Sequence, residues 1–187
     1  MASDRNDERL AAPGDLELVR DFVNSLDILP GTDKFADPAG LAIWLADHRL
    51  LPLSPVLTDK DLARVKRLRE ALRAFLLANA GFPLTPEAAE AFDDAAGPAR
   101  LRTRADEEGW LELLPVDEGG LGHAIGRLVS IVFAEQQDGT WSRLKVCAEC
   151  QWALYDHTKN YSAAWCGSQC GARVRSRRYR QRRGSPA

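Results

Sequence analysis

The chain has 187 residues, of which 45% are hydrophobic, so it can fold as one larger domain or as an ordinary domain with a small appended module. It contains no uninterrupted apolar stretch long enough to cross a bilayer, and residues 1–8 lack the apolar core of a signal peptide. These features argue against a membrane or secreted protein, and we expect a cytoplasmic one.

The net charge of −2 is distributed unevenly along the chain. Residues 141–187 hold ten Lys or Arg against two acids, which gives +8, and the first 140 residues therefore carry −10. A basic terminal segment attached to an acidic body is typical of a module that binds a polyanion.

Helical patterns dominate the first 140 residues. Residues 1–14 are charged and small, and we expect a disordered lead-in there, followed by a helical domain over 15–139. Thr58 and Asp61 have the spacing of a pair that caps a helix N-terminus. Apolar residues at helical spacing predict helices over 16–26, 38–48, 59–79, 86–95 and 123–135.

A β-hairpin is predicted near 100–115, because two short apolar strands flank an acidic turn at 106–109. The fold class is therefore mainly α (α+β). Trp44 and Trp110 fit core positions. The basic residues of the helix over 59–79 are interpreted as its solvated face: Arg64, Lys66, Arg67, Arg69 and Arg73.

The chain's four cysteines lie in two pairs, Cys147 with Cys150 and Cys166 with Cys170. Two short-spaced pairs separated by fifteen residues match a four-thiolate zinc site, in which each pair holds one edge of a tetrahedral ion. A catalytic zinc would keep an open position and use His or Glu ligands, which this pattern does not supply. The sequence therefore predicts one structural Zn²⁺ per chain.

Other uses of the cysteines explain less of the pattern. Disulfides need an oxidising compartment. A thioredoxin-like pair would use Cys147 and Cys150 but leave Cys166 and Cys170 without a role. An iron–sulfur cluster also takes four thiolates, but two regular pairs in a compact module fit zinc better. His157 is interpreted as a polar turn residue, because a fifth ligand is unusual for structural zinc.

Residues 140–187 are expected to form the zinc module. A strand leads into the first cysteine pair, a second follows it, and residues 161–165 return towards the metal after a polar turn. Cys166 and Cys170 are four residues apart, so both face one side of a helix that begins near Gly167. Knuckle, hairpin and helix in this order predict a treble-clef-like zinc finger, whose small core makes zinc important for its folding.

The helix after Cys170 is rich in arginine, a side chain whose planar fork donates two bonds to a phosphate at once. At 100° per residue the arginines form two stripes, with Cys170 and Val174 between them on the side that faces the zinc. A solvated or frayed basic end is the alternative. The candidate nucleic-acid contacts are Arg173, Arg175, Arg177, Arg178, Arg180, Arg182 and Arg183.

Two groups of residues carry a family resemblance. The string LKVCAECQW at 144–152, with Asp156, Asn160, Ser162, Trp165-Cys166 and Cys170-Gly171-Ala172-Arg173, resembles the CGNR zinc-finger domain. The upstream FVNSL at 22–26, with Pro38, Leu41, Trp44 and Leu45, resembles the ABATE domain that usually precedes it. The chain departs from the family at Ala172, where the motif has asparagine, and at Ala163-Ala164, where the family carries arginines.

The resemblance implies a bacterial, stress-linked transcription regulator whose zinc finger binds DNA. It gives the zinc-ligand role to the four cysteines and makes Arg173 the terminal arginine of the signature. We therefore expect a nucleic acid, DNA in the first place, as the partner. A small-molecule effector of the helical domain and a homodimer are further possibilities.

The alternative is a protein-interaction module in which zinc folds a platform and the basic helix binds an acidic partner. An enzyme is not expected, since no paired base and nucleophile and no phosphate-cradling loop is evident. The polar residues that could line a pocket are expected to be satisfied structural groups: Asn24, His48, His123 and Ser130.

Overall fold

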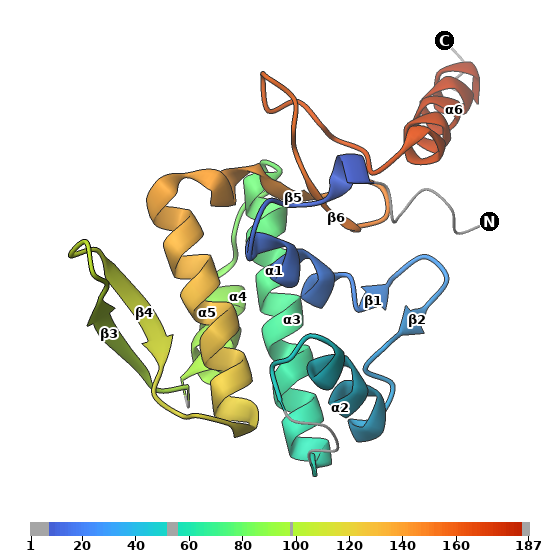
Figure 1. Cartoon of the computed structure of the whole chain (residues 1–187). Coiled ribbons are helices and arrows are strands. Elements are labelled where there is room, and N and C mark those ends of the chain that lie inside the picture. Colours follow the sequence, from blue (N-terminus) through green and yellow to red (C-terminus); the bar gives the residue numbers. More distant parts are fainter. Residues whose placement is uncertain (1–7, 52–55, 98, 185–187) are drawn as a thin grey trace.

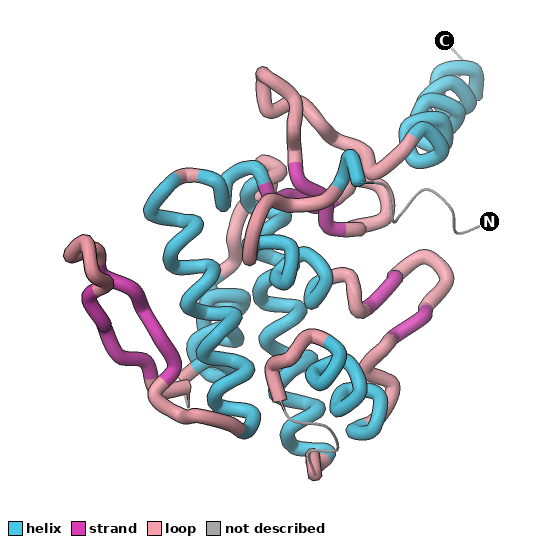
Figure 2. Tube along the Cα trace, viewed as in Figure 1, coloured by secondary structure: helices cyan, strands magenta, loops and turns pink. Residues whose placement is uncertain are grey.

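The computed structural model describes residues 8–51, 56–97 and 99–184. Helices dominate these residues, and the strands in them pair as three two-stranded antiparallel hairpins (Figure 2), which confirms the mainly α class. The elements are η1 (Glu8–Leu10), α1 (Leu16–Val23), β1 (Leu26–Asp27), β2 (Thr32–Asp33), α2 (Pro38–Asp47), α3 (Asp59–Asn79), α4 (Pro86–Ala96), β3 (Leu101–Ala105), β4 (Leu111–Pro115), α5 (Gly120–Asp138), η2 (Thr140–Arg143), β5 (Leu144–Val146), β6 (Ala153–Tyr155) and α6 (Ser168–Gly184).

The core lies where α1 packs on both α3 and α5, with the β3–β4 hairpin outside α5 (Figure 1). Phe22, Phe35 and Trp44 pack ring against ring at centroid distances of 5.4–5.8 Å. Trp44 is buried, as predicted. The prediction for Trp110 is wrong, because this side chain is 73% exposed at the turn of the β3–β4 hairpin, where the core does not reach.

Helix α3 has its predicted bounds, and Thr58 and Asp61 form the predicted capping box. Its basic residues do not all face solvent, however. Arg69 and Arg73 are only 2% and 3% exposed, so the solvated-face interpretation is wrong for these two. Arg69 follows Val65 at the spacing of the apolar stripe and therefore lies on the buried side of the helix.

The start of the chain differs from the expected lead-in. Residues 1–7 lie outside the described part, but residues 8–10 form η1 and Ala12 is buried. His157 of the zinc module holds this segment through a 2.8 Å hydrogen bond between its Nε2 and the carbonyl oxygen of Ala11. A partner distant in sequence therefore orders residues that have no helical pattern of their own.

The β5–β6 hairpin belongs to two apolar clusters at once. Leu144, Val146, Ala153 and Tyr155 are buried in the main core with α1 and α3. Leu154 points to the opposite face of the hairpin and is buried among the four cysteines. The boundary expected at 139/140 therefore does not separate two independent cores, and the division of the chain into a helical domain and a zinc module remains our proposal.

Residues 161–165, expected to return towards the metal, contain no strand. Side chains rather than a strand partner satisfy this backbone. Lys145 Nζ donates to the Tyr161 carbonyl at 2.6 Å, and Asp156 Oδ2 accepts from the Ala163 N–H at 2.9 Å. None of the described helices combines the length and apolar character needed to cross a membrane.

Candidate metal centre and nucleic-acid interface

The first cysteine pair lies in the turn that joins β5 to β6. Cys147 follows β5 directly, and its N–H donates to the Trp152 carbonyl at 2.8 Å, while the Gln151 N–H donates back to the Cys147 carbonyl at 2.9 Å. Gln151 has a φ of 57°, a left-handed conformation that a non-glycine residue holds only when its surroundings enforce it. The hairpin thus forms a tight knuckle that points both thiols the same way.

The second pair comes from the start of α6. Cys166 precedes the helix and Cys170 lies in its first turn, so their side chains lie on one face. The Ala148 N–H of the knuckle donates to the Ala164 carbonyl at 3.0 Å and draws the two segments together. The predicted meeting of the two pairs is therefore present in the structure.

The four sulfur atoms fit one zinc ion. All lie within 4.8 Å of one another, with 3.5 Å between Cys150 and Cys166 and 3.7 Å between Cys166 and Cys170. Zinc–sulfur bonds of about 2.3 Å in a tetrahedron place sulfurs about 3.8 Å apart. A disulfide would need about 2 Å. All four side chains are at most 8% exposed, as a closed structural site requires.

The protonation state of the four thiols depends on a bound cation. Hydrogen bonds from Cys150 and Cys166 lower the pKa of Cys147, and the bond to Cys147 raises the pKa of both Cys150 and Cys166. Four close thiolates repel one another, so full ionisation of the cluster needs a divalent cation. Zinc binding must release protons, so zinc affinity falls as pH falls.

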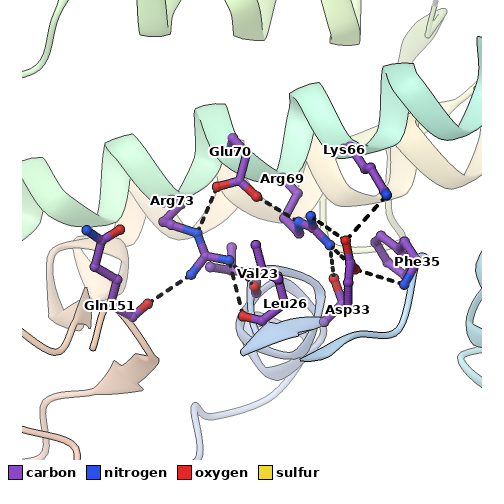
Figure 3. Close-up of polar contacts among 10 residues, drawn as sticks. Val23, Leu26, Asp33, Phe35, Lys66, Arg69, Glu70, Arg73 and Gln151 are labelled. Atoms are coloured by element: carbon purple, nitrogen blue, oxygen red, sulfur yellow. Dashed lines mark hydrogen bonds and ion pairs between the residues drawn. The ribbon is translucent and has the colours of Figure 1, made fainter. Parts of the chain in front are cut away.

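A buried arginine of α3 holds the knuckle (Figure 3). Arg73 Nη1 donates to the Gln151 carbonyl at 2.9 Å, and Nη2 donates to the carbonyls of Val23 at 2.7 Å and Leu26 at 3.5 Å. Its Nε donates to Glu70 at 3.0 Å. One guanidinium thus bonds both the end of α1 and the residue in the strained knuckle position, directly after the ligand Cys150.

Figure 3 also shows that Glu70 lies between Arg73 and Arg69. Arg69 Nε donates to Glu70 at 2.9 Å, and its two terminal nitrogens bond both carboxylate oxygens of Asp33 at 2.6 and 3.1 Å. Two parallel bonds fix both orientation and distance. Arg69 therefore secures the β1–β2 hairpin to α3 beside the residues that Arg73 contacts.

Two asparagines make further bonds to the β5–β6 hairpin. Asn24, at the end of α1, exchanges both amide hydrogen bonds with the backbone of Ala153, at 2.7 and 3.0 Å. Asn79, at the end of α3, donates to the carbonyls of Trp141 and Leu144 at 2.8 and 2.9 Å. The hairpin is therefore bonded to the helical domain near the start of β5 and at the start of β6.

A buried ion pair fixes the loop between the knuckle and α6. Asp156 is fully buried and accepts from Lys145 at 2.9 Å, from both the N–H and the hydroxyl of Thr158, and from the Ala163 N–H. Burial would raise its pKa, but the hydrogen bonds, led by those from Thr158 and Lys145, outweigh it and lower the pKa to about 2.

All seven predicted arginines are exposed on α6. The helix buries only Cys170, Gly171 and Val174, on the side predicted to face the metal. Arg177 differs from the others because it forms two bonds with Glu149 of the knuckle, at 2.5 and 3.3 Å. That pair braces α6 against the metal site and leaves six arginines without an acidic partner among the described residues.

The other polar residues singled out in the sequence have structural partners. Beside Asn24, His48 Nδ1 bonds the Trp44 carbonyl, His123 Nδ1 bonds the Asp117 carbonyl, and Ser130 donates to the Gly126 carbonyl. The structure places Asn24 after α1, His48 after α2, and both His123 and Ser130 on α5, so they do not form one site. His157 bonds Ala11 rather than the cysteine cluster.

Sequence reasoning missed the residues that hold the metal site in place, namely Arg73, Asn79, Lys145 and Asp156. A signal existed for Arg73, since it lies four residues after Arg69 and three before Leu76, on the buried side of α3. The others bond backbone atoms or a residue of another segment, and such partners leave no local pattern.

A family model described as "Putative stress-induced transcription regulator", ABATE, matches residues 16–135. The chain belongs to the ABATE family. A second model, the CGNR zinc finger, matches residues 143–183 of this ABATE protein and contains the four clustered cysteines. Neither is an enzyme family, and together they confirm the resemblance found in the sequence. A search of curated proteins found no matching relative.

Zinc removal from the ABATE protein should release α6 but leave the hairpin in place, because β5 and β6 are buried in the main core whereas α6 is attached through the cysteines. Native mass spectrometry should find one zinc per chain. After chelation, hydrogen exchange should accelerate over 165–184, with α3, β5 and the loop that Asp156 holds still protected. Cys166→Ser should give the same pattern, and unfolding of the whole chain in either case would contradict this expectation.

Replacing Arg73 by Met should destabilise the fold by about 2–4 kcal/mol, because several buried carbonyls lose their donor. It should also speed zinc transfer to a colour-forming chelator about tenfold, since Gln151 is no longer held beside Cys150. Arg64→Met, on the exposed face of the same helix, is the matched control and should change neither quantity. Equal zinc transfer in the two variants would exclude a positioning role for Arg73.

Asp156 should contribute pH-dependent stability. Its folded pKa of about 2 lies below the ordinary 3.8, so the contribution is complete above about pH 4 and is lost as pH falls towards 2. Urea unfolding of the wild type and Asp156→Asn should therefore differ by about 2 kcal/mol more at pH 7 than at pH 2. Zinc release at low pH affects both proteins and cancels. Asp94→Asn, at an exposed site, should show no such dependence.

Proposed function

We propose that this ABATE protein is a cytoplasmic transcription regulator that binds nucleic acid through α6, with the zinc site as the anchor of that helix. The observation that carries the proposal is that the metal site and the arginine-rich helix share a residue. Cys170 is both a zinc-site residue and part of the first turn of α6, and the arginines on the following turns are exposed.

Charge and chemistry support a phosphate partner. The six arginines other than Arg177 lack a carboxylate partner among the described residues, so their forks are free to bind. A phosphate accepts two parallel bonds from a guanidinium, and release of the counterions condensed on a nucleic acid adds to the affinity. The family description of the helical domain as a transcription regulator agrees with this partner.

A second candidate rests on the ion pair between Arg177 and Glu149. A carboxylate already satisfies one arginine of α6, so an acidic protein surface could satisfy others. The −10 body of another copy would supply such carboxylates. This candidate predicts cross-links between α6 and residues 1–140.

Nucleic-acid binding should weaken steeply with salt. If the six unpaired arginines each neutralise one phosphate, log affinity should fall with log salt at a slope of about −5, and each Arg→Gln change should reduce the slope by about 0.9. Fluorescence polarisation with zinc-loaded protein measures both. Arg64→Gln, on the exposed face of α3, is the control and should leave the slope unchanged. Absence of binding to DNA and RNA at low salt would end the proposal.

A further inference from the structure

Helix α6 stands away from the rest of the molecule (Figure 1). Its buried residues end at Val174, and among the described residues every side chain from Arg175 to Arg183 is exposed. None of the other described helices and strands packs extensively on α6. At 1.5 Å per residue the segment 175–183 forms a rod about 13 Å long, accessible around its circumference except where Arg177 bonds Glu149 near its base.

The arginines surround this rod rather than forming one face. At 100° per residue, with Cys170 as zero, the buried residues Gly171 and Val174 lie at about 100° and 40°. Arg178 and Arg182 lie at about 80° and 120°, in line with that buried sector but one and two turns beyond it. The remaining five fall at about 140°, 220°, 280°, 300° and 340°: Arg175, Arg183, Arg180, Arg173 and Arg177, in that order.

The distribution of arginines around the helix distinguishes a partner with a flat surface from a partner with a groove. A helix that lies on a flat surface, whether an acidic protein or a single strand, uses roughly one half of its circumference. A helix inside a groove meets a phosphate wall on both sides. The major groove of B-form DNA is about 12 Å wide, which matches the 10–12 Å diameter of a helix with its side chains. The minor groove, about 6 Å wide, and the narrow major groove of duplex RNA exclude it.

We infer that the nucleic acid is duplex DNA and that the free part of α6 lies in its major groove. The inference rests on the proposed function and specifies its partner. The residues beyond Arg177 span about 9 Å, or about three base pairs at 3.4 Å per pair. Arg178 and Arg182 then face one phosphate wall, and Arg180 and Arg183 face the other or the base edges. Zinc and the Arg177–Glu149 pair hold the base of the rod outside the groove.

Binding of zinc-loaded full chain to labelled probes of one sequence tests the docking mode. The probes are a DNA duplex, the same duplex with glucosylated hydroxymethylcytosines filling the major groove, the RNA duplex, and single-stranded DNA. We expect the unmodified DNA duplex to bind at least about tenfold more tightly than the other three, and netropsin in the minor groove to have no effect. Equal affinity for unmodified and glucosylated DNA, or preference for RNA or a single strand, overturns the docking mode while nucleic-acid binding stands. Failure to bind any probe overturns the proposed function as well.

Two double variants test the circumference directly. Arg178→Gln with Arg182→Gln, and Arg180→Gln with Arg183→Gln, remove equal charge from opposite sides of α6 and keep a good helix former at each position. In a groove both variants lose affinity, by about fivefold or more each. If only one of them loses affinity, α6 lies on a flat surface and the inference is wrong. Unchanged zinc content and circular dichroism verify that both variants are folded.

Discussion

A buried guanidinium is the constraint on which the arrangement of this protein depends. A charge in the interior must be fully hydrogen-bonded, because removing one partner leaves a large desolvation cost uncompensated. Arg73 meets this requirement only when the end of α1, the side chain of Glu70 and the zinc knuckle all lie within reach. Folding of the helical domain therefore determines where the knuckle can be.

The metal site is built from two kinds of structure. The knuckle lies on a hairpin that shares the main core and bonds Asn24 and Asn79, so it is formed by the fold itself. The second cysteine pair lies on a loop and a helix whose buried contacts are few, so the ion must supply their attachment. Zinc thus joins the knuckle, which the fold itself holds, to α6, whose attachment depends on the ion. The candidate arginines all lie on α6.

Most of the fold and the metal site can be predicted from local patterns in the sequence. Helical spacing gave the bounds of α3, and paired cysteine spacing gave the four residues that meet. The errors share one cause. Arg69, Arg73 and residues 8–14 were misjudged because their partners are distant in sequence: Asp33 for Arg69, the Val23 and Gln151 carbonyls for Arg73, and His157 for the first segment. Trp110 was misjudged because no distant segment covers it. Long-range partners override local propensity and are not visible in one sequence.

The single-ended attachment of α6 makes it a lever. The helix is about 25 Å long at 1.5 Å per residue, and its fulcrum is the cysteine cluster at its first turn. From Cys170 to Arg183 the arm is about 20 Å, so a rotation of about 10° at that fulcrum moves the far end by about 3.5 Å, close to the rise of one base pair. A small displacement of the knuckle, which Arg73 holds through the Gln151 carbonyl, is therefore enlarged along the arm towards Arg183.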